Sequence, residues 1–481
     1  MILYWIRTDV RLDDNPALEA AANLAVDKNE PLVALFVETP EQWEKHDRAP
    51  IQIDFLERHL NLVKDKLAEL NVPLIFESAK DFDAQIDVCT RICKEHNVTH
   101  VFLNQELEIN EVNRDSAFKN RLNENDIEYS SYESDVVLPK GQVLNKQHEM
   151  YRVFTPFKRE WLSVAITQGF YLADSKESLT RYFNANISMP DGVAVNEGSI
   201  TFTATKKDSS NWPLITNVRS ELIPDFYERI IVRYPEDRDI PSIEGTSKLS
   251  PYLAIGALSP KRLVSQLMFT VPNILDNTSL PEFGWLNQLI WRDFYRNLLF
   301  HYPELCKHNN FNKKYDGLDW PNNGFLFKAW KEGKTGYPIV DAAMRQLLET
   351  GWMHNRLRMV VASFLTKHLL IDWRLGEQFF AQHLIDVDLA NNNGGWQWAA
   401  GTGCDAQPYF RIFNPISQSQ KFDPDGTFLR KYLPELKNFS NKDIHFPHKV
   451  IKSEKIKAYW PAIVDHKTAR ENALDFYKSK E

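Results

Sequence analysis

The chain has 481 residues, of which 43% are hydrophobic and 25% are charged, and its formal net charge is −8. This length predicts at least two domains, and the absence of a run of about 18 apolar residues excludes a membrane-spanning helix. The charge argues against a general nucleic-acid binder, but it is uneven: residues 1–130 carry 14 basic and 26 acidic residues, and the remainder carries 43 and 39. A local basic face on the later part fits this distribution.

The N-terminus lacks the basic start and apolar core of a signal peptide. The four cysteines are too few and too scattered for a disulfide framework. They are Cys89, Cys93, Cys306 and Cys404. We therefore expect reduced thiols and a cytoplasmic protein, with no metal site.

Strands and helices alternate over residues 1–130. Apolar runs predict strands at 2–7, 31–37, 72–76 and 99–103, and helical spacing predicts helices at 50–70 and 82–96, with a further helix opening at Asn15-Pro16. Buried strands separated by helices predict a doubly wound parallel sheet. The first strand is followed by Arg7-Thr8-Asp9 and not by the glycine-rich dinucleotide fingerprint, which disfavours that class of site.

The pattern weakens from 131 to 205, which predicts a long interdomain linker over the surface. From 206 onward helical spacing dominates, for example at 261–269, 285–301 and 336–349. We expect three parts: an α/β domain at 1–130, the linker at 131–205, and an almost entirely helical domain at 206–481.

Eight of the 13 tryptophans lie between Trp285 and Trp398. On the predicted helix at 285–301, Gln288, Trp291 and Arg292 share one face, which suits either the wall of a pocket or an ordinary core face. Residues 244–250 can aim backbone N–H groups at a phosphate or can simply cap a helix.

Asp386 and Asp388 lie two residues apart, on the same side of an extended segment. Buried aspartates need cationic partners, and Arg358 is a candidate. A metal site is an alternative, but His383 is the only other nearby ligand type.

Together these motifs resemble the photolyase/cryptochrome flavoprotein family, and most closely the bacterial class I cyclobutane pyrimidine dimer photolyases with a folate antenna. The strings are EGTSKLS at 244–250, WLNQLIW at 285–291, KTGYPIVDAAM at 334–344, GWMHNRLRM at 351–359 and DVDLANNNGGWQW at 386–398. The resemblance extends from Arg7 to at least Pro415. It implies an α/β antenna domain, a helical FAD-binding domain, and light-driven repair of pyrimidine dimers in double- or single-stranded DNA by electron transfer from FADH−.

The resemblance also implies a role for individual residues. The flavin contacts would be Tyr234, Thr246, Ser247, Lys248, Leu249, Ser250, Trp285, Arg292, Asn355, Arg358, Asp386, Val387, Asp388 and Asn392. The chain of electron carriers would be Trp320, Trp373 and Trp396. The flipped dimer and its DNA would meet Arg238, Gln288, Trp291, Asn355, Arg356, Met359, Trp398 and Arg411. The antenna, 5,10-methenyltetrahydrofolate, would meet His46, Asn110, Glu111, Cys306 and Lys307. A monomer is expected.

One residue departs from the family pattern. Dimer-splitting photolyases usually have glutamate where this chain has Gln288, and glutamine is familiar there from (6-4) photolyases and animal cryptochromes. Asn392 and the folate residues argue for dimer repair, and a short charged tail after Tyr459 argues for an enzyme. We therefore hypothesise that dimer repair persists with a lower quantum yield, with (6-4) repair or a blue-light photoreceptor as the alternatives.

Overall fold

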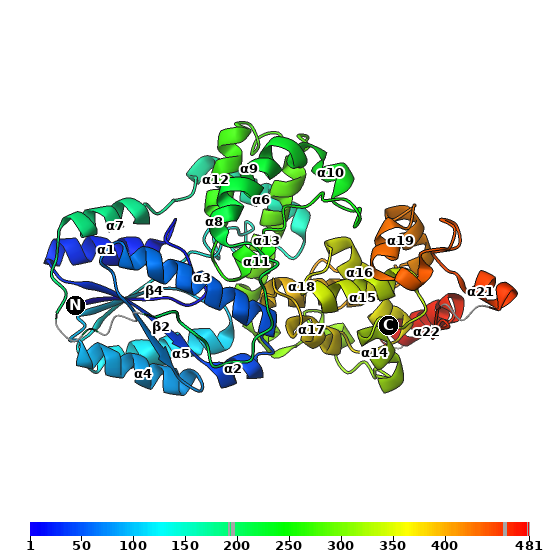
Figure 1. Cartoon of the computed structure of the whole chain (residues 1–481), viewed down its shortest axis with the longest axis horizontal. Coiled ribbons are helices and arrows are strands. Elements are labelled where there is room, and N and C mark those ends of the chain that lie inside the picture. Colours follow the sequence, from blue (N-terminus) through cyan, green and yellow to red (C-terminus); the bar gives the residue numbers. More distant parts are fainter. Residues whose placement is uncertain (191–192, 194–197, 456–458, 479, 481) are drawn as a thin grey trace. The chain divides into compact units, whose positions relative to one another are not determined.

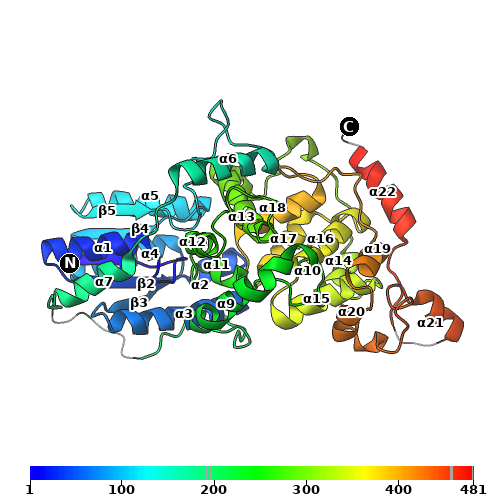
Figure 2. The same cartoon turned by 90° about the horizontal axis from the view of Figure 1, so that it is seen from above.

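A computed structural model describes residues 1–190, 193, 198–455, 459–478 and 480. The chain divides into two compact units (Figures 1 and 2). Unit 1 contains residues 1–151, 155–227 and 248–306, and unit 2 contains residues 152–154, 228–247 and 307–481. No helix among the described residues combines the length and the hydropathy that crossing a bilayer requires.

Unit 1 is built on a five-stranded parallel sheet in the order β3-β2-β1-β4-β5. The strands are β1 Ile2–Trp5, β2 Leu32–Glu38, β3 Leu74–Ser78, β4 His100–Asn104 and β5 Glu128–Tyr132. The intervening helices are α1 Pro16–Lys28, α2 Pro40–Lys45, α3 Pro50–Ala68, α4 Phe82–Glu95 and α5 Ile109–Asn123. Helices α1 and α7 cover one face and α4 and α5 the other (Figure 1), so the doubly wound sheet is confirmed.

The turn after β1 is held by side chains where a dinucleotide-binding fold has glycines. Asp9 accepts hydrogen bonds from the Tyr4 hydroxyl at 2.6 Å and the Arg7 backbone N–H at 2.8 Å. Gly256 packs directly against this turn. Its φ is +68°, and a Cβ there would lie 2.0 Å from the Thr8 carbonyl oxygen, so only glycine fits at this position. The Asn15 side chain caps α1 by accepting from the Leu18 N–H at 3.1 Å, as its sequence predicts.

Three elements of the α/β region were not predicted, namely the six-residue helix α2, helix α5 and strand β5. Strand β5 has the polar sequence EYSSY and lies at the sheet edge, where one ladder of neighbours is missing, so apolar alternation is not required. Helix α5 buries only Arg114, Phe118 and Leu122, which is too narrow an apolar stripe for spacing to reveal.

The segment 131–205 is more structured than an interdomain linker over the surface. It carries α6 Phe154–Gln168 and α7 Ser175–Asn184. Trp161 is fully buried, and its indole N–H donates to the Asp293 carboxylate at 2.9 Å. Apart from residues 152–154, which belong to unit 2, the described part of the segment therefore packs in unit 1. The linker prediction was wrong here: α6 has 15 residues and buries Phe157 and Trp161, and α7 has 10 residues.

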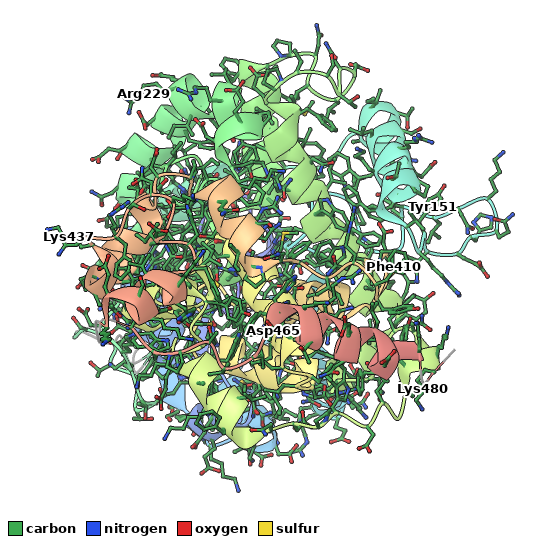
Figure 3. All side chains as sticks on the ribbon, turned by 90° about the vertical axis from the view of Figure 1, so that its right-hand side faces the viewer. Tyr151, Arg229, Phe410, Lys437, Asp465 and Lys480 are labelled. Carbon is green, nitrogen blue, oxygen red and sulfur yellow. The ribbon has the colours of Figure 1, made fainter. Side chains whose placement is uncertain are left out.

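Unit 1 also holds α8 Ile215–Asn217, α9 Ile223–Asp225, α11 Ser250–Ala254, α12 Pro260–Thr270 and α13 Phe283–His301. All regular secondary structure among the described residues of unit 2 is helical. The helical domain predicted from 206 onward does not coincide with this unit, because residues 206–227 and 248–306 belong to unit 1. Its helices are α10 Tyr234–Asp237, α14 Gly324–Lys331, α15 Pro338–Thr350, α16 Asn355–Ser363, α17 Trp373–Ala381, α18 Leu389–Ala400, α19 Pro415–Phe422, α20 Thr427–Tyr432, α21 His448–Glu454 and α22 His466–Lys478. Asp465 and Lys480 mark the two ends of α22 in Figure 3.

Candidate functional site

Helix α13 carries the predicted pocket residues of unit 1. Trp285 is buried against Phe226 and Tyr227, with ring centroids 5.3 and 5.5 Å away. One turn on, the Gln288 Nε2 donates to the Gly284 carbonyl oxygen at 3.1 Å. Because the amide nitrogen is used within the helix, the Oε1 is the end that can accept a hydrogen bond from a ligand.

The same helix is anchored through charges. The buried Arg292 guanidinium donates to the Asp135 backbone carbonyl, and Arg296 pairs with the Asp135 carboxylate at 2.8 Å. Burial disfavours ionisation of Asp135, but Lys140, Arg296 and Arg292 outweigh it and hold the pKa of this carboxyl well below its usual range. Helix α13 therefore keeps a fixed rotation relative to the loop that follows β5.

In unit 2, Arg358 on α16 pairs with Asp386, which lies between α17 and α18. One guanidinium nitrogen contacts both carboxylate oxygens at 3.0 and 2.8 Å, and Nε donates to the Met353 carbonyl at 2.8 Å. The Asp386 side chain is 3% exposed. The predicted partnership is confirmed, and it fixes a positive group beside a buried negative one.

Helix α18 begins at the second aspartate. The Asp388 carboxylate caps it by accepting from the Asn391 N–H at 3.0 Å and from the Asn391 side chain at 2.7 Å. One residue on, the Asn392 Nδ2 donates to the Glu377 carbonyl oxygen at 3.0 Å. A carbonyl partner fixes which end of the amide faces it, so Oδ1 is directed away from Glu377 as an acceptor.

Two of the three predicted electron-carrying tryptophans are fully enclosed. Trp396 packs edge-on against Phe380 at 5.0 Å and Trp330 at 6.1 Å. It also packs onto Gly376 of α17, where a Cβ would lie only 2.2 Å from the indole. Trp373 lies one turn before Gly376 on the same helix, and its N–H donates to the Asn310 side-chain oxygen at 3.0 Å.

Trp320 is the half-buried member of the set. It contacts Phe476 and Tyr477 of α22, with ring centroids 5.0 and 6.1 Å away. Trp396 on α18 and Trp373 on α17 are thus buried, and Trp320 is partly exposed, all within unit 2. We call Arg358, Asp386, Asn392, Trp373 and Trp396 the flavin cluster.

Two predicted phosphate-contacting arginines of unit 2 share one carboxylate, that of Asp239. Arg356 donates to Asp239 at 2.7 Å, and Arg238 lies 3.8 Å from the other oxygen of the same carboxylate and over the Tyr234 ring. Gly245, in the 244–250 segment, packs against Asp237 so closely that a Cβ would lie 2.8 Å from backbone atoms. This glycine is required by packing.

The remaining predicted residues are distributed as follows. Half-buried are Thr246, Ser247, Lys248, Trp291, Met359, Val387 and Trp398; Leu249 is buried; Ser250, Asn355, Lys307 and Arg411 are exposed. Next to Arg411, Phe410 is 61% exposed (Figure 3). Of the full set, Lys248, Leu249, Ser250, Trp285, Gln288, Trp291 and Arg292 belong to unit 1, together with the antenna residues other than Lys307.

Three predicted antenna residues meet in unit 1, where α2 ends and α5 begins. The His46 Nε2 lies 2.7 Å from the Gln42 amide and 3.1 Å from the Asn110 amide, while its Nδ1 lies 3.4 Å from Glu111. With both amides donating, Nε2 accepts and the ring proton on Nδ1 faces the carboxylate. The second Glu111 oxygen is buried with no hydrogen-bond partner among the described residues.

Sequence reasoning missed Glu108, which belongs to the same corner. Burial and the neighbouring Glu111 raise the pKa of Glu108 to about 7. Burial, with Glu108 and Glu111 nearby, also raises the pKa of the Cys306 thiol to about 11. We call His46, Glu108, Asn110, Glu111 and Cys306 the antenna cluster. The three closely spaced glutamates at 106, 108 and 111 could have indicated this cluster of acidic groups from the sequence.

Comparison with known proteins agrees with this geometry. The sequence model described as DNA photolyase matches residues 2–174, and the one described as FAD binding domain of DNA photolyase matches residues 285–479. The deoxyribodipyrimidine photo-lyase of Escherichia coli is 42% identical over 99% of this chain and 98% of its own length, and that of Vibrio cholerae is 44% identical over 100% and 99%. The chain belongs to the photolyase/cryptochrome family.

Solved structures extend the likeness to the fold. A class III photolyase from Agrobacterium tumefaciens aligns with a TM-score of 0.80 at 32% identity, covering 100% of this chain and 97% of that one. A cryptochrome from Synechocystis aligns with a TM-score of 0.81 at 26% identity, covering 99% of both. Equal fold similarity to a repair enzyme and to a cryptochrome means that the fold alone does not decide the activity.

Proposed function

We propose that this chain is a light-driven DNA repair lyase that splits cyclobutane pyrimidine dimers. The observation that carries the proposal is 42–44% identity to deoxyribodipyrimidine photo-lyases over 99–100% of the chain. Identity to the cryptochrome of equal fold similarity is only 26%. The finer assignment, a class I enzyme with a folate antenna, is part of the proposal.

The chemistry of the flavin cluster fits FAD. Fully reduced FAD, when bound, supplies an electron on absorbing blue light. Asn392 would present Oδ1 to a flavin N–H, because its amide nitrogen is committed to Glu377. Arg358 and Asp386 would offer one cationic and one anionic edge in fixed positions, since each already holds the other.

The three tryptophans would restore the reduced cofactor. Trp396 would give up an electron first, Trp373 and Trp320 would refill it in turn, and a reductant in solution would refill Trp320. The Trp396 indole N–H has no acceptor among the described residues, and Trp373 faces only a neutral amide oxygen. Within the part of the chain that the structure describes, neither indole N–H donates to a base, so the hole would move outward without proton transfer to the protein.

Photolyases take the damaged bases out of the stack before repair. Trp291 and Trp398 would stack against the flipped dimer, and the Gln288 Oε1 would accept a hydrogen bond from it. Arg238, Arg356 and Arg411 would contact phosphates, which position the DNA without reading its sequence.

The antenna cluster suits a pterin edge. An amino-substituted pyrimidine ring could donate to the buried Glu111 oxygen that has no partner among the described residues, and to the carboxamide oxygen of Asn110. This supports 5,10-methenyltetrahydrofolate as the antenna. Its loss would reduce light capture without removing repair.

The deciding experiment is illumination of the purified, flavin-loaded and reduced protein with ultraviolet-treated oligonucleotide. We expect dimers to disappear under near-ultraviolet or blue light and to persist in the dark. Repair of (6-4) photoproducts instead would change the lesion class. If the protein repairs neither lesion, the proposal of a repair enzyme is wrong and a photoreceptor is the better interpretation. A monomer in the cytoplasm remains our prediction.

A further inference from the structure

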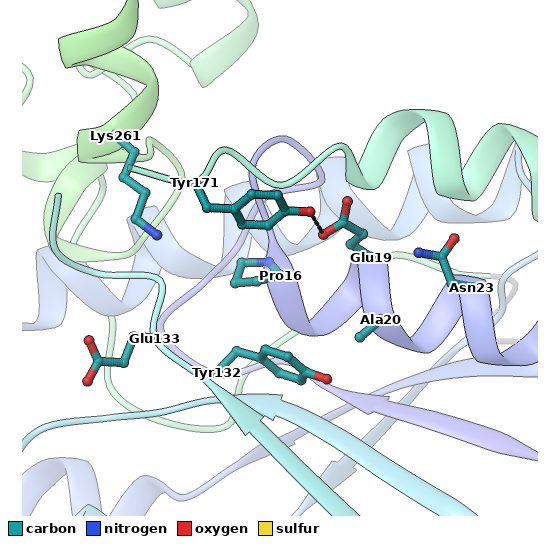
Figure 4. Close-up of a pocket in the computed structure, with 8 residues that line it drawn as sticks. All are labelled: Pro16, Glu19, Ala20, Asn23, Tyr132, Glu133, Tyr171 and Lys261. Carbon is teal, nitrogen blue, oxygen red and sulfur yellow. Dashed lines mark hydrogen bonds between the residues drawn. The ribbon is translucent and has the colours of Figure 1, made fainter. Parts of the chain in front are cut away.

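A pocket in unit 1 is lined by none of the residues assigned above. It has a volume of about 430 Å³ and is lined by Pro16, Glu19, Ala20, Asn23, Tyr132, Glu133, Tyr171 and Lys261 (Figure 4). Small-molecule sites in proteins begin at roughly 300 Å³. Tyr132 is the last residue of β5, so the pocket opens at the carboxyl edge of a parallel sheet, where α/β folds place ligands.

One wall is a single face of α1. Pro16, Glu19, Ala20 and Asn23 follow the spacing of neighbouring helical turns. The polar groups on this wall are already committed. The two Glu19 oxygens accept from the Tyr171 hydroxyl at 2.6 Å and the Asp174 N–H at 2.8 Å. The wall therefore has a fixed shape before any ligand arrives.

Tyr171 is unusual for an exposed aromatic residue. Its side chain is anchored by the hydrogen bond to Glu19, yet the residue is 64% exposed. Figure 4 shows its ring and that of Tyr132 on opposite sides of Pro16. A ring held in place over an open pocket offers a flat apolar face at little entropic cost, which suits stacking against another ring.

Lys261, in the first turn of α12, supplies the charge. Only 8% of the residue is exposed, and its amino group points into the pocket on the side of Glu133 (Figure 4). Among the described residues it forms no hydrogen bond or ion pair. Burial outweighs the pull of Asp14 and Glu133 and lowers its pKa. The amino group thus faces the pocket without a protein partner among the described residues, and an anion bound there would gain a charge-assisted hydrogen bond.

The neighbouring carboxylates do not fill this role. Asp14 accepts from the Ala173 N–H at 2.8 Å and from the Ser259 hydroxyl, and Glu133 accepts from the Lys140 N–H at 2.9 Å. These bonds hold both acids away from ion-pair distance of Lys261.

We propose that this pocket binds a small planar aromatic compound with an anionic group, the class to which nucleoside monophosphates belong. The ring lies against Tyr171, and the anion meets Lys261. The site is independent of the repair reaction.

The test is calorimetric titration of the FAD-loaded protein in the dark with 5′-AMP, and with adenosine and inorganic phosphate as half-ligands. We expect one saturable site for 5′-AMP and weaker binding of each half. Lys261→Met should weaken 5′-AMP by about tenfold or more, the worth of a charge-assisted hydrogen bond. Lys176→Met removes the same charge from the first turn of α7, where the side chain is 64% exposed, and should bind 5′-AMP as the wild type does.

Tyr171→Leu provides a second variant on the exposed rim, where folding is not at stake. It should weaken 5′-AMP severalfold, whereas Tyr171→Phe keeps the ring and should bind more tightly than the leucine variant. Absence of saturable binding to the wild-type protein, or equal binding by Lys261→Met, would overturn the proposal. Dimer repair by these variants should match the wild type, so failure here would leave the repair function untouched.

Discussion

The flavin cluster and the antenna cluster differ in how their buried carboxylates are paired. Asp386 is buried and held by Arg358 through both oxygens. Glu111 is held by His46 through one oxygen, and its other oxygen is buried without a partner among the described residues. A paired charge is stable before the ligand binds, whereas an unpaired one gains stability from the ligand. The first site is thus preorganised, and the second depends on occupancy.

Breaking the preorganised pair should have the largest effect. Asp386→Asn leaves the Arg358 guanidinium without its carboxylate, which costs about 3 kcal/mol when a buried pair loses one partner. At about 1.4 kcal/mol per tenfold, FAD affinity would fall by roughly a hundredfold. Flavin absorbance per protein and urea unfolding measure both losses.

The control for this variant is Glu332→Gln, which removes the same charge from a surface pair with Lys334 at 2.9 Å. Exposed pairs contribute little, so it should keep its flavin and its stability. Full flavin occupancy in Asp386→Asn would show that the pair does not prepare the site.

Packing around Trp396 offers a second way to disturb the flavin cluster. In Gly376→Ala the new methyl group would lie 2.2 Å from the indole and 2.7 Å from Leu365, so one of them must shift. We expect a stability loss on the order of 1–3 kcal/mol and severalfold slower photoreduction of the flavin, followed by absorbance under continuous light.

Gly324→Ala, at the start of α14, has nothing within 4 Å of its added Cβ and is the matched control. Photoreduction of Gly376→Ala at the wild-type rate would mean that the position of Trp396 does not limit electron transfer.

The antenna cluster should make the stability of the folded protein depend on pH. The pKa of Glu108 is about 7 in the folded chain, against an ordinary value of 4.5, because of burial and Glu111. The folded state thus holds this proton more tightly than the unfolded chain, so stability falls as pH rises from about 4.5 through about 7. Glu108→Gln should remove this loss and stabilise the protein at pH 8 by on the order of 1 kcal/mol.

Denaturant unfolding at several pH values measures the effect. Glu124→Gln, on an exposed acid beside Arg121, should leave the pH profile unchanged. If Glu108→Gln shows the wild-type profile, the antenna cluster is not strained by its carboxylates and the contrast with the flavin cluster weakens.

These contrasts explain what the sequence could predict. The parallel sheet and the long helices followed from apolar periodicity, and the Arg358–Asp386 pair followed from the cost of burying an aspartate. Glu108 did not, because its altered pKa arises from burial and from Glu111, three residues away, and neither is visible as a pattern. Strand β5 was missed because this edge strand buries none of its residues and so shows no period. Helix α6 was missed although its 15 residues include the buried Phe157 and Trp161, because the polar stretches around it dominate the segment.

The smallest expected effect concerns Gln288, which belongs to neither cluster. Its Nε2 donates to the Gly284 carbonyl oxygen at 3.1 Å, a bond that an ionised glutamate cannot make. Gln288→Glu would therefore turn the side chain away from Gly284 and offer the dimer a group that can hold or share a proton. We expect a modest rise in dimers repaired per absorbed photon, measured at saturating DNA so that affinity does not enter. An unchanged or lower yield would mean that glutamine serves this enzyme as well as glutamate.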